Sequence, residues 1–212
     1  MQRIAIIDYN MGNLHSVERA MRHVAGTEAT ITVTADPDII YKADRIVFPG
    51  QGAARDCMRE LETRGIGDVV REVIQTKPFL GICMGMQVLM QHSEENGGID
   101  CLSIYAGNVR YFGTVHQEIG VRLKIPQMGW NQVWQQVEHP LWQGIQDGAR
   151  FYFVHSYYVE PNTPDLIAGS TDYGMHYTSA IAKDNVFAIQ CHPEKSADDG
   201  LQLLKNFVNW QL

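Results

Sequence analysis

The sequence has no apolar run close to the roughly 20 residues that a membrane-spanning helix requires. Cysteine is scarce, with four in 212 residues, no CxxC pair and no spacing typical of a zinc site. Basic residues are also few, since 17 Lys and Arg stand against 24 Asp and Glu, for a formal net charge of −7. This charge balance argues against a nucleic-acid-binding surface as the main function. The first residues lack the pattern of a signal peptide, so we expect a cytoplasmic protein with free thiols.

No internal repeat, linker or low-complexity tract divides the chain, and we expect residues 1–212 to form a single domain. The composition, 45% hydrophobic and 19% charged, is ordinary for a globular protein with a substantial core. In the first half, apolar strand patterns alternate with helical patterns, which predicts an α/β fold with a mostly parallel, doubly wound sheet flanked by helices. The expected strands cover residues 4–7, 29–33, 45–48 and 79–82, and the expected helices cover residues 14–24, 54–61 and 66–75, with another beginning after Asp36.

The second half is less regular and contains short strand patterns in close succession. They lie at residues 109–111, 133–135, 151–154, 166–168, 179–182 and 186–189. Their density predicts an antiparallel extension of the sheet. A last helix is expected over residues 197–210, where Ser196 and Asp199 resemble a capping box.

Residues 79–87 combine an apolar strand, a glycine-rich turn and the start of a helix, in the sequence Phe-Leu-Gly-Ile-Cys-Met-Gly-Met-Gln. Gly-X-Cys-X-Gly after a strand is the pattern of a nucleophile elbow, with sulfur in place of oxygen. Its glycines permit a strained turn that holds the side chain clear of the sheet, and a helix N-terminus favours thiolate over thiol. We therefore predict that Cys83 is a catalytic nucleophile rather than a small buried apolar side chain.

The candidate base lies in the segment Gln-Cys-His-Pro-Glu at residues 190–194. On an extended backbone His192 and Glu194 point to one face, and Pro193 restricts the backbone between them. A thiol, an imidazole and a carboxylate are the parts of a nucleophile, base and orienting group. The sequence therefore predicts that Cys83, His192 and Glu194 act together.

Two nearby side chains receive other interpretations. Cys191 adjoins His192, so alternation along a strand turns it the opposite way, and we expect a core thiol. His155 follows the strand pattern at residues 151–154 and is a competing base, for which a structural, hydrogen-bonded role is preferred.

Residues 49–52, Pro-Gly-Gln-Gly, follow the third strand at what should be the same edge of the sheet as Cys83. A tight turn is the simplest interpretation, but glycines also allow a peptide plane to flip and present its N–H group to a developing oxyanion. The N–H of Met84, directly after the nucleophile, would be the second donor. Gln87 is one helical turn beyond Cys83 and shares its face, so it can reach a substrate held at the sulfur.

The sequence resembles the class I, triad-type, glutamine amidotransferases. The likeness is carried by residues 81–87, by His-Pro-Glu at 192–194 and by the Pro-Gly pair at 49–50. Within that family, the chain is most similar to the glutaminase subunits of imidazole glycerol phosphate synthase. Residues 8–14, 124–131, 153–158 and 190–196 carry this second likeness.

The resemblance implies that Cys83 attacks glutamine with His192 and Glu194 as its partners, and that no metal or organic cofactor is needed. Ammonia would pass through a channel to a (β/α)₈-barrel cyclase subunit in a step of histidine biosynthesis, with no nucleic-acid or membrane partner. The expected oxyanion and glutamine-binding residues are Gly50, Gln51, Gly52, Met84 and Gln87. The expected interface residues are Asn10, Asn13, Trp130, Tyr157 and Lys195.

The chain departs from the subfamily pattern at two positions. Gln51 stands where valine is typical, and Cys191 stands where an aromatic residue is typical. Three alternatives remain open at this point: an amidotransferase that serves another synthase, such as the pyridoxal phosphate glutaminase; a cysteine hydrolase acting alone on a γ-glutamyl or ester substrate; and a non-catalytic interaction protein on the same fold.

Overall fold

The computed structural model describes residues 1–120 and 122–212 and is built on one large mixed sheet. The parallel half of this sheet consists, in spatial order, of β2 (Ala29–Thr34), β1 (Gln2–Ile7), β3 (Arg45–Gly50), β4 (Phe79–Cys83) and β14 (Val186–Ile189). Every residue of β3, β4 and β14 is buried. Burial on both faces explains the continuous apolar runs of these strands in the sequence.

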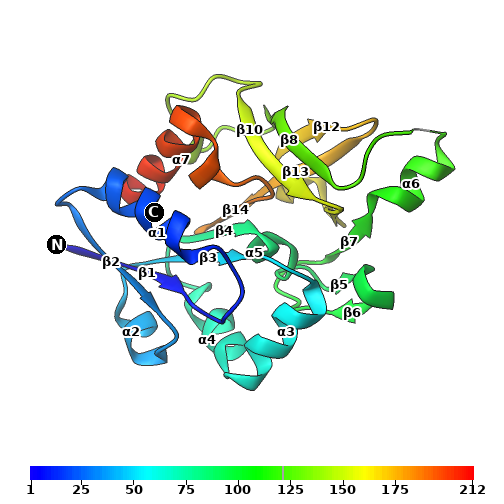
Figure 1. Ribbon diagram of the computed structural model, residues 1–212. Coiled ribbons are helices and arrows are strands. Elements are labelled where there is room, and N and C mark those ends of the chain that lie inside the picture. Colours follow the sequence, from blue (N-terminus) through cyan, green and yellow to red (C-terminus); the bar gives the residue numbers. More distant parts are fainter. Residues whose placement is uncertain (121) are drawn as a thin grey trace.

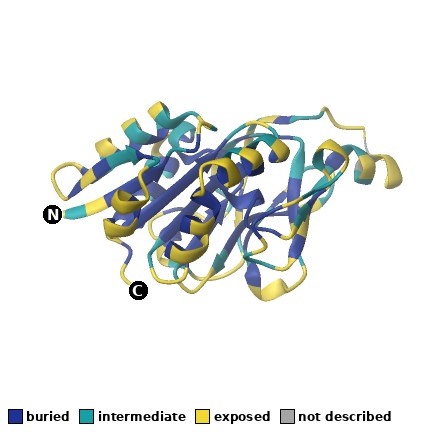
Figure 2. Cartoon of the chain, turned by 90° about the horizontal axis from the view of Figure 1, so that it is seen from below, coloured by how far each residue is buried: buried dark blue, intermediate teal, exposed yellow. Residues whose placement is uncertain are grey.

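Helices cover both faces of the parallel half (Figure 1). One face carries α1 (Leu14–Ala25) and α7 (Ala197–Asn209), which pack against each other. The other face carries α2 (Pro37–Lys42), α3 (Ala54–Thr63) and α4 (Ile66–Val73). Figure 2 shows the buried sheet enclosed by helices whose outer surfaces are exposed. The expected α/β fold with a doubly wound parallel sheet is therefore confirmed.

The first two helices begin where the sequence places them. The side chain of Asn13 accepts a hydrogen bond from the N–H of Ser16 at 3.4 Å, and α1 ends at Gly26, whose φ is +51°. The side chain of Asp36 accepts from the N–H of Asp38 at 2.9 Å, directly before a proline in the first turn. Both caps satisfy backbone donors that have no acceptor inside the helix.

The antiparallel extension begins beyond β14 and is also confirmed. It continues through β13 (His176–Lys183), β11 (Tyr157–Pro161) and β7 (Gly107–Tyr111). β5 (His92–Ser93) then pairs with β7 in parallel, and β6 (Ile99–Asp100) pairs with β5 in the antiparallel direction. β12 (Ile167–Asp172) pairs with β13 and with β9 (Trp134–Gln135), and a separate two-stranded sheet joins β8 (Gln127–Gln132) to β10 (Arg150–His155). The short α5 (Met84–Gln87) follows β4, and α6 (Phe112–Glu118) follows β7. The 3₁₀ helices are η1 (Glu95–Gly97), η2 (Pro140–Trp142), η3 (Pro164–Leu166) and η4 (Pro193–Lys195).

Two apolar clusters lie on opposite faces of the sheet, because side chains alternate along each strand. Ile4, Ile6 and Val47 pack with α1 and α7, whereas Ile46 and Phe48 pack with α3 and α4. The sheet therefore separates two cores and holds the carboxyl ends of its central strands at fixed positions.

One local prediction, the cap at Ser196, is wrong. Ser196 makes no side-chain cap to α7; its hydroxyl donates to the carbonyl of His192 at 2.6 Å and accepts from the N–H of Tyr152 at 2.9 Å. The hydroxyl thus ties the segment after β14 to β10 instead of capping a helix. The strands β8 and β11 and the helix α6 were not expected.

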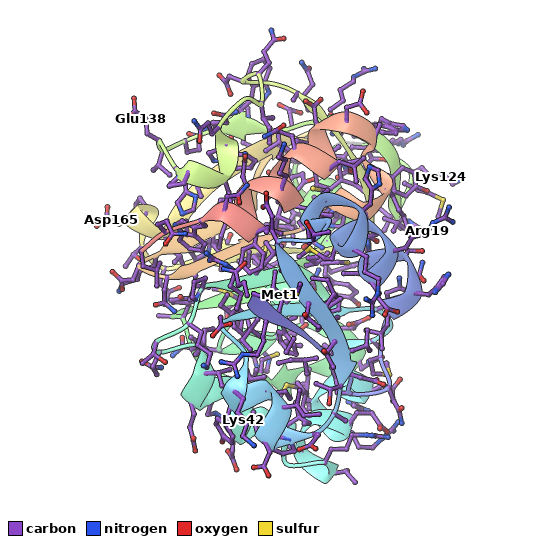
Figure 3. The ribbon with its side chains drawn as sticks, turned by 90° about the vertical axis from the view of Figure 1, so that its left-hand side faces the viewer. Met1, Arg19, Lys42, Lys124, Glu138 and Asp165 are labelled. Carbon is purple, nitrogen blue, oxygen red and sulfur yellow. The ribbon has the colours of Figure 1, made fainter. Side chains whose placement is uncertain are left out.

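Several charged side chains mark the outer surface of the molecule. Figure 3 shows Arg19, Lys42, Lys124, Glu138 and Asp165 pointing outward from different parts of the chain. Within the described ranges, no helix is long and apolar enough to cross a membrane.

Candidate active site

The turn between β4 and α5 holds Cys83 in a conformation that is rare for a residue with a side chain, with φ +54° and ψ −110°. Two glycines allow this turn to form. A Cβ on Gly81 would lie 2.8 Å from the Cβ of Ala188, and a Cβ on Gly85 would overlap the carbonyl oxygen of Phe48. The helix that begins at the nucleophile can therefore approach β3 only because both positions lack a side chain.

Three neighbouring parallel strands deliver the predicted site residues to one edge of the sheet. Gly50, at the end of β3, lies directly opposite Cys83, at the end of β4. On the other side of β4, Ile189 of β14 pairs with Ile82, and the chain reaches His192 three residues later. Ligands of such sheets bind outside the carboxyl ends of the strands, which is where these groups meet.

His192 and Glu194 form a buried pair. His192 Nδ1 lies 2.9 Å from Glu194 Oε1, and the side chains are 3% and 1% exposed. Burial alone would lower the pKa of His192, but hydrogen bonds and charge interactions with Cys83 and Glu194 raise this pKa to about 10. The positively charged imidazolium beside sulfur is the environment in which reactive thiolates occur.

The sequence predicts that an extended backbone brings His192 and Glu194 together, but the structure joins them by a 3₁₀ turn. His192 is extended, with φ −104° and ψ 93°, but Pro193, Glu194 and Lys195 form η4 rather than a continued strand. The tight turn brings the carboxylate back to the ring nitrogen. Cys191 lies in the core with no measurable exposure, as expected from the sequence.

The loop at residues 50–52 lies beside the sulfur of Cys83 and is held by a hydrogen bond from Cys57. The carbonyl oxygen of Gln51 accepts a hydrogen bond from Cys57 Sγ at 3.4 Å, and Cys57 in turn lies 3.9 Å from the hydroxyl of Tyr9. Burial raises the pKa of Cys57 to about 12, so its sulfur keeps the proton that it donates. Gly52 has φ +91°, a backbone conformation that favours glycine.

The sequence predicts that the N–H of Met84 is an oxyanion donor. Met84 is the first residue of α5, and the first N–H groups of a helix have no intrahelical acceptor. The dipole of the first turn adds to the attraction for negative charge. This group and the 50–52 loop flank the sulfur.

A cavity of about 450 Å³ opens beside Cys83, a volume in the usual range of small-molecule sites. Glu95 and Lys195 supply charges of opposite sign to its wall. The carboxylate of Glu95 accepts from the N–H of Ala54 at 2.6 Å, and burial raises its pKa. The other lining residues are Gln51, Gly52, Cys83, Met84, Gln87, Pro126, Val154, His155, Ser156, Tyr157 and His192.

His155 also borders this cavity but has no carboxylate partner among the contacts found in the described residues. Its Nδ1 lies 2.7 Å from the carbonyl oxygen of Tyr157, and its Nε2 lies 3.3 Å from the hydroxyl of Tyr177. Burial lowers the pKa of His155 to about 4. A neutral ring fixed at both nitrogens is suited to a structural role.

Gln87 is more constrained than the sequence suggested. Its Nε2 donates to the carbonyl oxygen of Tyr157 at 3.1 Å and to Oε1 of Gln190 at 2.9 Å. Its own Oε1 is buried and has no hydrogen-bond partner in the described residues. Gln190 was not identified from the sequence, although it directly precedes Cys191 and His192; its Nε2 lies 3.6 Å from Cys83 Sγ.

The expected interface residues lie around this edge of the sheet. Trp130 is 49% exposed, and its ring centroid lies 6.2 Å from that of Tyr152; Lys195 Nζ lies 6.0 Å from the same Tyr152 ring. The ring of Tyr157 packs against that of Tyr111, with the centroids 5.1 Å apart and the planes tilted by 43°. Trp130, Tyr152 and Lys195 thus form a continuous surface beside the cavity.

Asn10 and Asn13 have local structural roles in the loop after β1. Asn10 has φ +67° and donates its N–H to Asp8 Oδ1 at 2.9 Å, whereas Asn13 caps α1. No group of three or more His, Cys, Asp or Glu suited to a metal ion occurs in the described ranges.

Comparison with known proteins identifies relatives over the whole chain. The family model for glutamine amidotransferase class-I matches residues 5–210. The imidazole glycerol phosphate synthase subunit HisH of Thiobacillus denitrificans is 58% identical over 209 residues, which cover 98% of this chain and 91% of the relative. The HisH subunit of Pseudomonas putida is 54% identical over 210 residues, covering 99% and 98%.

Solved structures share the fold at much lower identity. A PurLQS structure from Thermotoga maritima superposes with a TM-score of 0.71 at 15% identity, covering 98% of each chain. A glutamine amidotransferase crystal structure gives a TM-score of 0.71 at 15% identity, covering 97% of this chain and 99% of the other. At such identity the likeness concerns the fold alone.

Proposed function

This chain belongs to the class I glutamine amidotransferases, and we propose from that premise that it is the glutaminase subunit of an imidazole glycerol phosphate synthase in histidine biosynthesis. One observation carries the proposal: Cys83, at a strained strand-to-helix turn, lies beside a histidine whose other ring nitrogen contacts a buried carboxylate. This arrangement supplies a nucleophile, a base and an orienting group for acyl transfer.

The chemistry follows from these positions. His192, oriented by Glu194, takes the proton of Cys83, and the sulfur attacks the side-chain amide carbon of glutamine. N–H groups of Met84 and of the 50–52 loop stabilise the oxyanion, each by about 3 kcal/mol. His192 then protonates the departing ammonia, and water hydrolyses the glutamyl thioester to glutamate. The steps use only side chains and backbone of the chain and require no metal or organic cofactor.

The 50–52 loop is the proposed point of control. Because Gln51 presents its carbonyl oxygen to the thiol of Cys57, rotation of this loop breaks a defined hydrogen bond. A competent loop state that is disfavoured by about 2.7 kcal/mol is populated in about 1% of molecules, and a partner that prefers this state raises turnover by up to about a hundredfold. The proposed partner is a (β/α)₈-barrel cyclase subunit that receives the ammonia.

The test measures glutamate formation from glutamine by three samples: this chain alone, the chain with the cyclase, and the chain with the cyclase and its ribotide ligand. We expect the lowest rate in the first sample and the highest in the third. Equal rates in all three contradict control by the partner and favour a hydrolase that acts alone. The absence of glutamate in all three contradicts the glutaminase assignment itself.

We further propose that the cyclase docks on the edge of the sheet that surrounds the cavity, because ammonia must leave the site without entering bulk water. Lys195, Tyr157 and Trp130 lie on this edge, and aromatic side chains are enriched among the residues that dominate interfaces. Asn10 and Asn13 lie in the loop after β1, at the same edge.

Lys195→Ala should weaken the complex and reduce glutamine-dependent synthesis more than ammonium-dependent synthesis by the cyclase. Asn13 is less suitable for this test, since its side chain caps α1. Lys42→Ala, on the distant helix α2, serves as the matched control. If Lys195→Ala leaves both affinity and glutamine-dependent turnover at wild-type values, the docking surface lies elsewhere.

A further inference from the structure

We propose that Gln190 is a fourth catalytic residue, whose side-chain amide donates a hydrogen bond to the sulfur of Cys83 and stabilises it as a thiolate. Gln190 follows β14 and is fully buried, and its Nε2 lies 3.6 Å from Cys83 Sγ. Its backbone N–H donates to the carbonyl of Ser179 at 2.8 Å, which fixes the residue against β13. This inference rests on the proposed role of Cys83 as nucleophile.

The orientation of the Gln190 side-chain amide, with its NH₂ group toward Cys83, follows from the position of a backbone carbonyl. The carbonyl oxygen of Tyr157 can only accept, so Gln87 must present its NH₂ group to it. The same nitrogen lies 2.9 Å from the Gln190 side chain, which must therefore present its oxygen to Gln87. The remaining face of the Gln190 amide, its NH₂ group, is then the one that meets the sulfur.

The carbonyl oxygen of Tyr157, which sets the orientation of the Gln87 and Gln190 amides, is itself held in place. The Tyr157 carbonyl also faces Nδ1 of His155 at 2.7 Å, so its two lone pairs have two partners. A flip of the Gln190 amide would place two NH₂ groups against each other and leave an oxygen facing the sulfur. The hydrogen-bond network therefore holds an N–H donor against Cys83 before any substrate arrives.

A fixed donor at this position acts on the reactive form of sulfur. Hydrogen bonding to the charged form of a group favours that form. His192 lies beside the same sulfur and accepts its proton, so His192 and Gln190 have complementary tasks. In the neutral glutamyl thioester the sulfur accepts this bond only weakly, and the bond strengthens again as water expels the thiolate, which makes the sulfur a better leaving group.

The other titratable groups near the sulfur do not compete for this task. Tyr9, Cys57 and Cys191 interact with Cys83 electrostatically, and burial raises the pKa of each, which keeps all three neutral at neutral pH. None of the three can supply a positive charge to the sulfur of Cys83. Cys57 donates its S–H to the carbonyl oxygen of Gln51 rather than to this sulfur. Gln190 is thus the neutral donor directed at the nucleophile.

The experiment measures the rate at which iodoacetamide alkylates Cys83 between pH 5 and 10, without glutamine, in the full chain. Gln190→Leu removes the donor, so its rate profile should shift to higher pH and its rate at neutral pH should fall about 10- to 100-fold. The exposed Gln146→Leu is the matched control and should behave as wild type. A Gln190→Leu profile that superimposes on the wild-type profile overturns the proposal.

A second variant keeps the proposal testable if Gln190→Leu does not fold. Gln190→Glu retains the oxygen that accepts from Gln87 but replaces the N–H donor with a negative charge, so it should slow alkylation at least as much. In the unaltered protein, the side-chain ¹⁵N–¹H signals of Gln190 should shift when Cys83 is alkylated. The proposed hydrogen bond is overturned if the Gln190 side-chain signals do not change on alkylation, or if Gln190→Glu is alkylated at the wild-type rate.

Alkylation does not depend on the identity of the substrate. A wild-type chain that fails to hydrolyse glutamine would contradict the proposed function and leave the alkylation result standing. A chain that hydrolyses glutamine with the same kcat/KM in wild type and Gln190→Leu would instead contradict the role of Gln190 alone.

Discussion

The four cysteines show how the surroundings of a side chain decide its chemistry. Cys57, Cys101 and Cys191 are buried thiols whose pKa values burial raises, to about 12 for the first two. Cys83 instead lies at a helix start, on the wall of a cavity and beside a charged imidazole. The distinction lies in the backbone turn and in partners that arrive from distant strands.

Cys83→Ala should abolish glutamine hydrolysis, with a loss of at least about a thousandfold, because the described part of the chain places no second nucleophile beside His192. Cys191→Ala is the matched control, since this thiol packs in the core and should be dispensable for turnover. Circular dichroism and glutamate formation measure folding and activity. Near-normal turnover of Cys83→Ala would refute the mechanism, and loss of activity in a folded Cys191→Ala protein would show that the core thiol has a further role.

At the residue scale, the sequence is informative where chemistry and local spacing coincide. The elbow around Cys83 and the two-residue spacing of His192 and Glu194 point to the site, although a 3₁₀ turn rather than a strand joins the pair. Gln190 could not be predicted in the same way. Its contact with Cys83 spans 107 positions of the chain and depends on the direction of a side-chain amide.

At the scale of elements, the turn between strand β4 and helix α5 is so tight that it requires glycine at positions 81 and 85. A Cβ on Gly85 would overlap the carbonyl oxygen of Phe48, whereas a Cβ on Gly67 in α4 would lie 3.4 Å from the flexible end of the Arg71 side chain. The two glycines are both helical and buried, but only one of them is required.

Gly85→Ala should destabilise the fold by roughly 3 kcal/mol or more, because its methyl group would displace the end of β3. Gly67→Ala should be neutral or stabilise by up to about 1 kcal/mol, since alanine favours the helix and finds ordinary contacts. Urea denaturation of both variants measures the difference. Equal midpoints for the two variants would show that the elbow can relax around a methyl group.

Strands whose apolar residues face the core could be predicted from the sequence. Strands whose apolar residues face outward could not. The strand β14 coincides with its expected residues 186–189, and the parallel strands differ from expectation only at their ends. In β8 the buried residue is Gln127, while Met128 and Trp130 are 62% and 49% exposed. The large apolar side chains of this strand alternate with smaller or polar ones but face outward, so the pattern does not mark a face that packs on the core.

On the scale of the whole molecule, two histidines, the buried His155 and the half-buried His139, link stability to pH. Burial lowers the pKa of His155 and of His139 to about 4, whereas an unfolded histidine titrates near 6.5. Below about pH 6.5 the unfolded chain binds protons that the folded chain does not, so stability falls as pH decreases toward 4. Above about pH 6.5 both states are neutral at these positions, and their contribution is constant.

His155→Gln should therefore lose less stability than wild type between pH 7 and pH 4, by at most roughly 3 kcal/mol. His15→Gln, at an exposed position, is the control and should leave the pH dependence unchanged. The free energy of unfolding at several pH values gives the comparison. Parallel curves for wild type and His155→Gln would show that this ring titrates alike in the folded and unfolded states.

The place of β14 in the sheet also governs how the protein emerges from the ribosome. Strands β1 to β4 can assemble as soon as they are made, but the outer edge of β4 meets its neighbour only when β14 follows, more than a hundred residues later. Until then the nascent chain exposes an apolar strand with unpaired backbone groups, the kind of edge that promotes aggregation. Under the proposed mechanism the same delay keeps the unfinished chain inert, because His192 and Glu194 follow β14: glutamine hydrolysis cannot begin before these residues have been made.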